Sequence, residues 1–271
     1  MTPLPALPLA GLAVLCAMML LLWVVSQRIR NAAVVDVGWG AALVILAGLY
    51  FAFGGGYAPR RTVVCAMVAL WGARLFVYLL TTRIIGHEEE GRYRRLRAEW
   101  GDAAPRKLLQ FFLMQAVAAV VLSVVFLIPA TNTASADGSP VAPLLPVELL
   151  GVLLWLTGFV GESLADHQLH RFKSDPANRG AVCRVGLWGV SRHPNYFFEW
   201  LMWVALAVFA LGSPMGWIGI ASPLIISFFL FRVTGIPATE EQALSTKGGA
   251  YREYQRTTSA FFPWFPKRGD R

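Results

Sequence analysis

One stretch of the sequence places four ionisable side chains at the spacing of a helix face. Glu162, Asp166, His170 and Lys173 follow one another at intervals of four, four and three residues, so they share one side of a helix. Three uses of this face remain open. A metal site would use Asp166, His167 and His170, although no cysteine or second histidine pair completes it. The other two are a polar wall for a nucleotide and a helix end that reaches toward water.

A second group surrounds the start of an expected helix. Residues 186–199 read GLWGVSRHPNYFFE, and we expect the helix to begin near Asn195, because proline is tolerated in a first turn. A helix N-terminus has unpaired amides and a positive dipole end, which suit a phosphate or a carboxylate. Three arginines are near in sequence: Arg179, Arg184 and Arg192. An interfacial loop that binds lipid headgroups is the alternative, but it leaves Asn195 and Glu199 without a role.

Two apolar stretches each contain an ionisable residue. Asp36 lies in VVDVGWG and Arg74 in WGARLFVY; such residues usually face a bundle interior, a partner or a wet cavity. They either serve chemistry or form a buried structural ion pair. Residues 87–100 (HEEEGRYRRLRAEW) form a charged segment, from which Glu90 and Tyr93 can close over a site.

The last forty residues combine acids, tyrosines and an aromatic segment. We expect Glu240, Glu241, Tyr251 and Tyr254 to belong to one helix. Residues 261–266 (FFPWFP) are expected to return to the membrane interface, where exposed aromatic side chains are ordinary.

The composition indicates that membrane-spanning helices position these candidate residues. Of the 271 residues, 56% are hydrophobic and 15% charged, against roughly 25% charged in a soluble domain. Apolar runs near the ~20 residues that cross a bilayer recur along the chain. The net charge of +8 comes from Lys and Arg in short connections, so it indicates topology and anionic lipid rather than nucleic acid. The three cysteines form no disulfide framework or zinc pattern.

The sequence predicts an all-α membrane protein with seven transmembrane helices in one domain. The expected spans are 6–26, 34–54, 62–84, 108–130, 144–170, 195–212 and 216–235, with a polar linker at 131–140. Residues 1–130 would form the substrate side and 144–271 the cofactor side. Lys and Arg concentrate in alternate connections and in the tail. The N-terminus is therefore expected outside and the C-terminus in the cytoplasm.

Several motifs of the chain resemble those of a known family. The resemblance rests on six motifs: DVGWG, WGARL, RHPNYFFE, TEEQAL, AYREYQR and FFPWFP. They resemble the membrane family labelled DUF1295 along nearly the whole chain. From Glu162 onward the chain is also similar to the steroid 5α-reductases and, more distantly, to the isoprenylcysteine carboxyl methyltransferases. The reductases enclose NADPH with their last helices and cytoplasmic loops, and their lipid substrate enters from the bilayer.

The resemblance implies NADPH as cofactor and names its contacts. Carried over to this chain, these are Glu162, Asp166, Lys173, Arg184, His193, Asn195, Tyr196 and Glu199, with Arg74, Arg232, Glu241 and Tyr254 as additions. A glutamate at 199 is typical of the reductases. The methyltransferases commonly have a small or apolar residue there, so Glu199 favours NADPH over S-adenosylmethionine.

One departure concerns the catalytic residues. The steroid reductases pair an acid in the second span with a tyrosine three residues before the arginine of the third. Asp36 can replace the acid, but Trp71 takes the tyrosine's place, and an indole N–H donates a hydrogen bond without transferring a proton as a phenol does. We therefore expect Asp36, as a neutral acid, Trp71 and Tyr78 to polarise or protonate the substrate.

The resulting expectation is an oxidoreductase: an NADPH-dependent reductase of a C=C bond in a steroid-, isoprenoid- or fatty-acid-like lipid. Its partners would be this lipid and the membrane, with no metal, nucleic acid or obligate protein partner. We expect it in the bacterial inner membrane with its active site facing the cytoplasm. A membrane methyltransferase that uses S-adenosylmethionine and a non-enzymatic lipid-binding protein are the alternatives.

Overall fold

Every regular element is helical in residues 6–134, 143–233 and 235–267, which are the residues that the computed structural model describes. This confirms the prediction that the described chain is all-α. Residues 135–140 of the expected linker lie outside the described residues. The chain divides into two compact units: Met1–Pro146 with Ala210–Gly219, and Val147–Phe209 with Ile220–Arg271.

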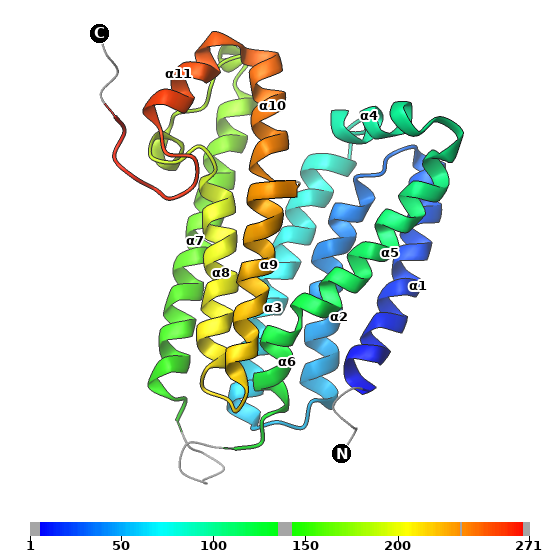
Figure 1. Ribbon diagram of the computed structural model, residues 1–271, viewed down its shortest axis with the longest axis vertical. Helices are drawn as coiled ribbons and strands as arrows, with labels where there is room; N and C mark the ends of the chain where they lie inside the picture. Colours follow the sequence, from blue (N-terminus) through cyan, green and yellow to red (C-terminus); the bar gives the residue numbers. More distant parts are fainter. Residues whose placement is uncertain (1–5, 135–142, 234, 268–271) are drawn as a thin grey trace. The chain divides into compact units, whose positions relative to one another are not determined.

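The first unit contains the N-terminal helices (Figure 1). They are α1 (Ala6–Ile29), α2 (Val34–Phe53), α3 (Ala58–Leu79), α4 (Gly91–Trp100), α5 (Ala104–Leu122) and α6 (Val124–Thr131). Two glycines bring α2 and α3 together: a Cβ on Gly40 would lie 2.8 Å from the backbone nitrogen of Phe76 and 2.9 Å from the carbonyl of Gly72. Small residues at such a crossing let backbones approach within a membrane.

Hydroxyl side chains mark two irregularities in these helices. The expected span 108–130 is divided at Ser123, whose hydroxyl donates to the Val120 carbonyl and also bonds the Tyr50 hydroxyl at 2.8 Å. α3 continues into a π-helical turn, Leu80–Ile84, where the Thr82 hydroxyl donates to the Tyr78 carbonyl. Hydroxyls bonded to the preceding turn commonly bend helices.

The second unit contains the remaining α-helices. They are α7 (Pro146–Ser174), α8 (Pro194–Ala210), α9 (Ala221–Phe228), α10 (Ile236–Lys247) and α11 (Gly249–Thr257). α7, α8 and α9 run side by side in Figure 1. Gly158 of α7 explains the close approach to α8, since a Cβ there would lie 2.6 Å from Met202 Cγ. The Trp200 indole of α8 donates to the Ser227 hydroxyl of α9.

One sequence expectation about the tail is wrong. The acid pair and the two tyrosines lie on two helices, α10 and α11, instead of one. The break falls at Gly248, whose φ of 55° lies in the left-handed region that glycine adopts without strain. As a result, α11 folds back toward the loop that precedes α8 (Figure 1).

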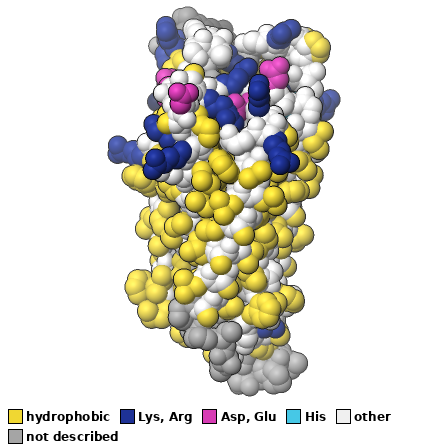
Figure 2. Space-filling view, turned by 90° about the vertical axis from the view of Figure 1, so that its right-hand side faces the viewer, with side chains coloured by type: hydrophobic (Ala, Val, Ile, Leu, Met, Phe, Trp, Pro, Cys, Tyr) yellow, Lys and Arg dark blue, Asp and Glu magenta, His cyan; other side chains and the backbone are white. Residues whose placement is uncertain are grey.

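Several helices are long and apolar enough to cross a membrane. Among the described residues there are six: Ala6–Ile29, Val34–Phe53, Ala58–Ile84, Gly91–Leu122, Pro146–Ser174 and Gly216–Lys247, the last running across the undescribed residue 234. On the face shown in Figure 2, hydrophobic side chains cover most of the length and charged side chains gather toward the top. The chain is therefore an integral membrane protein.

Candidate functional site

Asp36, an expected catalytic residue, lies in the first turn of α2. An acid there faces the positive end of the helix dipole. Its carboxylate accepts hydrogen bonds from Arg83 at 2.9 Å, from the Tyr93 hydroxyl at 2.9 Å and from Arg92. The ion-pair partners that the structure gives to Asp36 are therefore Arg83 and Arg92.

A second acid completes this cluster. Glu90 immediately precedes α4, and its carboxylate lies 3.0 Å from Arg83 Nε and 3.2 Å from Arg92 Nε. Charges thus alternate around a ring of two acids and two arginines, so each arginine contacts both acids. The ring holds α4 to the start of α2 and the end of α3.

Tyr93 belongs to the same cluster and is buried. Its hydroxyl donates to Asp36, and the Arg92 guanidinium lies over its ring, 4.5 Å from the centroid. Buried polar groups of this kind are normally satisfied by hydrogen bonds. The arrangement is that of a structural network in which the acid is already engaged.

The other residues expected to act on the substrate, Trp71 and Tyr78, lie along α3, and so does Arg74, an expected cofactor contact. Trp71, Arg74 and Tyr78 recur at intervals of three and four residues, so they share one helix face. Trp71 is fully buried, and the Arg74 guanidinium lies 5.7 Å from the centre of the Tyr78 ring.

In the second unit, α7 and α8 bring two expected cofactor residues together. The Asn195 amide, at the second position of α8, donates to Asp166 Oδ1 at 3.4 Å. Asp166 and Glu162 are both buried on the same face of α7, one turn apart. Glu199 lies one turn after Asn195 along α8.

The start of α8 is fixed by an acid from α10. Glu240 accepts a hydrogen bond from Arg192 Nε at 2.7 Å and from the Gln255 amide at 2.8 Å, and His193 Nε2 lies 3.3 Å from it. The His193 ring stacks on Tyr196 with centroids 5.5 Å apart.

The acid that contacts Arg192 and His193 is therefore Glu240, which was not among the expected cofactor residues. Its neighbour Glu241, which was, is exposed. Arg232 is also exposed, in the π-helical turn Phe229–Val233. A signal for Glu240 existed in the sequence: Ala243 and Leu244 follow it by three and four residues, so they share its helix face.

Basic side chains gather around the buried Cys183. Burial raises the pKa of its thiol, whereas its hydrogen bond with Val185 and the nearby Lys247 and Lys173 act to lower that pKa. Lys247 and Lys173 also interact electrostatically with each other. Lys247 was not among the expected site residues, because a lysine in the last turn of a helix is ordinary.

Arg184 adds a third positive charge near this thiol. Its guanidinium lies 5.4 Å from the centre of the Tyr254 ring, and Cys183 also interacts electrostatically with Tyr254. Within the described part of the chain, neither Arg184 nor Lys247 forms an ion pair. We call Lys173, Arg184 and Lys247 the basic cluster.

Tyr254 connects the basic cluster to the start of α8. Its hydroxyl is buried and donates to the carbonyls of Trp188 and Ser191. Burial, followed by the neighbouring Tyr251, raises its pKa above the ordinary value. At neutral pH it is therefore a fixed hydrogen-bond donor.

The charged and polar side chains of the second unit could hold an anionic ligand. Among the residues described, no group of three or more His, Cys, Asp or Glu side chains is placed to hold a metal. The basic cluster could place positive charge beside phosphate groups, and Asp166 with Asn195 could offer polar atoms to a ribose or an amide.

Comparison with known proteins gives one match. A family model described as protein of unknown function (DUF1295) matches residues 22–258. No curated protein matches the chain, and neither does any solved structure.

Proposed function

This chain belongs to the DUF1295 family, and from that premise and its own residues we propose an NADPH-dependent membrane reductase of a C=C bond in a lipophilic substrate. The proposal includes a likeness in activity to the steroid 5α-reductases. It rests on one observation above all, the basic cluster of the second unit.

The basic cluster favours a polyanion. Lys173 and Lys247 repel each other, and Arg184 lies over the Tyr254 ring near the same thiol. An anion that binds among like positive charges is attracted to each of them and offsets their mutual repulsion. NADPH carries three phosphate groups, whereas S-adenosylmethionine carries a positively charged sulfonium. The charge of the cluster thus separates the two nucleotides.

Further contacts come from the start of α8 and the face of α7. We propose that Asp166 and Asn195, which already lie 3.4 Å apart, exchange hydrogen bonds with the ribose or the carboxamide of the cofactor. Glu162 and Glu199 extend this polar face by one turn on each helix. His193, stacked on Tyr196 and beside Glu240, would hold the loop in place.

The chemical step divides between cofactor and protein. NADPH, when bound, supplies a hydride to one carbon of the double bond. Tyr78 would give its proton to the other carbon and recover one from water. The Arg74 guanidinium, beside the Tyr78 ring, would favour the negative charge left on the phenol oxygen. Trp71 can orient a carbonyl oxygen by a hydrogen bond but cannot protonate it.

For Asp36 we propose a structural role in place of the expected catalytic one. Its carboxylate is already bonded to Arg83, Arg92 and Tyr93.

Two other functions remain to be separated by experiment. A methyltransferase would bind S-adenosylmethionine, whose positively charged sulfonium would then lie near the positive charges of the basic cluster. A non-enzymatic lipid-binding protein would bind neither nucleotide, which would leave the basic cluster without a ligand.

The proposal also includes seven spans in the bacterial inner membrane, with the N-terminus outside and the tail in the cytoplasm. α8 would be the additional span: it has 17 residues, at the short end of the range of roughly 17–25 that crosses a bilayer.

Turnover tests the proposed reaction. Protein purified in detergent is mixed with an enone lipid and NADPH deuterated at C4 of the nicotinamide. We expect NADPH oxidation and one deuterium in the saturated product. Tyr78→Phe should lower turnover by about 10²–10⁴-fold, the scale for losing a general acid, with the affinity for NADPH retained. Methyl transfer from S-adenosylmethionine, without reduction of any enone lipid, would overturn the proposal.

A further inference from the structure

A pocket of about 350 Å³ lies within the C-terminal segment of the second unit, apart from the residues proposed to bind NADPH. It is lined by Gln255, Arg256, Thr257, Thr258, Ser259, Phe262, Trp264, Phe265 and Lys267. These residues include two cations and no acid. We propose that this pocket binds the phosphate headgroup of an anionic phospholipid.

Backbone hydrogen bonds build the pocket. The Lys267 amide donates to the Thr257 carbonyl at 2.8 Å and closes the segment into a loop. The Arg192 amide donates to the Ser259 carbonyl, and the Trp264 amide to the Val190 carbonyl. The loop is therefore fixed against the residues that directly precede α8.

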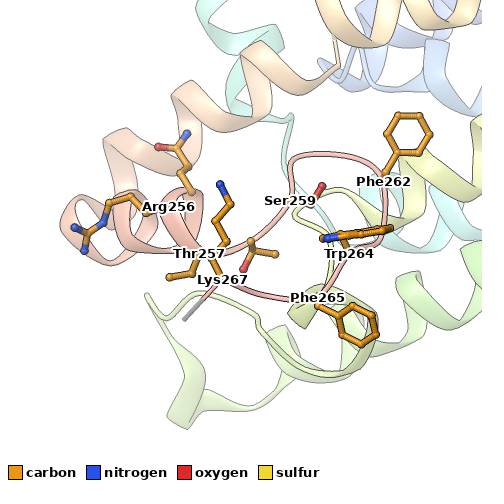
Figure 3. Close-up of a pocket in the computed structure, with 9 residues that line it drawn as sticks. Arg256, Thr257, Ser259, Phe262, Trp264, Phe265 and Lys267 are labelled. Carbon is orange, nitrogen blue, oxygen red and sulfur yellow. The ribbon is translucent and has the colours of Figure 1, made fainter. Parts of the chain in front are cut away.

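Its donors are available for a ligand. In Figure 3 the Lys267 amine, the Ser259 hydroxyl and the Trp264 indole nitrogen lie around the same space. Within residues 6–134, 143–233 and 235–267, none of these three groups has a hydrogen-bond partner. A phosphate accepts hydrogen bonds from ammonium, hydroxyl and indole groups alike.

The C-terminal loop packs beside the first turns of α8, and this position points to a lipid as the source of the phosphate. The Phe262 ring lies 5.8 Å from Phe197 and 5.9 Å from Trp200, both in the first two turns of the apolar helix α8. Since α8 is the proposed additional span, this level is where we expect the bilayer to meet water.

The rim of the pocket is apolar and uncovered. Phe262, Trp264 and Phe265 are 56%, 70% and 84% exposed. Adjacent exposed aromatics at the end of a span are typical of the interfacial belt, where rings enter the headgroup level. A basic pocket with such a rim matches the recognition of anionic headgroups.

Native mass spectrometry of the detergent-purified full chain tests this. The probes are phosphatidylglycerol, phosphatidylcholine and inorganic phosphate. We expect phosphatidylglycerol to bind in preference to phosphatidylcholine. Lys267→Gln and Arg256→Gln should each weaken its binding by about fivefold, the effect of one basic side chain near an anionic headgroup. Arg252→Gln is the matched control, since Arg252 lies exposed on the same helix, α11, and does not line the pocket.

Three results would overturn the inference. Equal losses in all three variants would mean that general surface charge attracts the lipid. Tight binding of inorganic phosphate, with no gain from the acyl chains, would mean a site for free phosphate. Displacement of phosphatidylglycerol by NADPH would assign the pocket to the cofactor. A melting temperature for each variant separates lost binding from lost folding.

Discussion

The Tyr93 hydroxyl donates a hydrogen bond to Asp36 Oδ1 at 2.9 Å, between residues 57 positions apart in the sequence. This contact joins α4 to the start of α2, and Arg83 and Arg92 bind the other oxygen of the same carboxylate. The acid that the sequence presents as a candidate proton donor is therefore the centre of an ion-pair network.

Asp36→Asn should lower the stability of the first unit. It leaves Arg83 and Arg92 facing a neutral amide. We expect a loss of about 1–2 kcal/mol, less than the 3–5 of a fully buried pair, because Arg92 is 44% exposed. Denaturant unfolding in detergent measures it. Glu88→Gln is the control, since Glu88 is 93% exposed and pairs only loosely with Arg94. Unchanged stability with abolished turnover would restore the catalytic role.

The adjacent glutamates of α10, Glu240 and Glu241, provide a test variant and its control. Glu240→Gln removes the charged partner of Arg192 and should cost about 1–3 kcal/mol of stability. Glu241→Gln, on the exposed side of the same turn, should change it by less than about 0.5 kcal/mol. Thermal unfolding of both proteins compares them directly. Similar losses would show that the contact seen at Glu240 does not stabilise the tail.

Stability should fall in alkaline solution through the two tyrosines of α11. Burial, with a further contribution from Glu240, raises the pKa of Tyr251 from 10.0 to about 12, and burial also raises the pKa of Tyr254. Below pH 10 both tyrosines keep their protons in the folded and in the unfolded state, so their full contribution to stability is present. Above pH 10 the unfolded state loses them first, and stability falls.

Melting temperatures between pH 8 and pH 11 measure this effect. The fall above about pH 10 should be shallower in Tyr251→Phe and Tyr254→Phe than in the original protein. Tyr254→Phe should also lower stability at pH 7 by about 1 kcal/mol, since its hydroxyl bonds to the carbonyls of Trp188 and Ser191 are lost. Parallel profiles in all three proteins would place the alkaline transition elsewhere.

The proposed orientation has its own test. A reporter that is active only in the cytoplasm should give signal when fused after Arg271 and none when inserted between residues 134 and 138. The reverse pattern would place the basic cluster on the side of the membrane that lacks NADPH.

The helices could be predicted from the sequence more fully than the contacts between them. The start of α2 at Val34 and the start of α8 beside Pro194 were expected within a residue, because apolar runs and proline are local signals. The break at Gly248 was missed, although glycine at a helix end is a known signal. The partners of Asp36 could not be found, since Arg83 and Tyr93 reach it only through the packing of α3 and α4.

For the candidate site, it was easier to predict which residues belong to it than which residues each of them contacts. The resemblance to the reductases implied that Asp166 and Asn195 contact the same cofactor, and the structure places the two side chains within a hydrogen bond of each other. The sequence did not distinguish Glu240 from Glu241, nor did it identify Lys247. Both depend on which side of α10 faces the loop before α8, and tertiary packing decides that.

Binding of NADPH is the most direct test of the central claim. Detergent-purified protein is titrated separately with NADPH and with S-adenosylmethionine by calorimetry. Lys173→Gln, Arg184→Gln and Lys247→Gln are compared with Arg252→Gln, an exposed arginine of α11 outside the basic cluster. We predict that NADPH binds and S-adenosylmethionine does not. Each cluster variant should raise the Kd for NADPH by about tenfold, the loss of one charge-assisted hydrogen bond, while the control leaves it unchanged. Binding of S-adenosylmethionine but not NADPH, or equal affinity for NADPH in all four variants, would contradict the account.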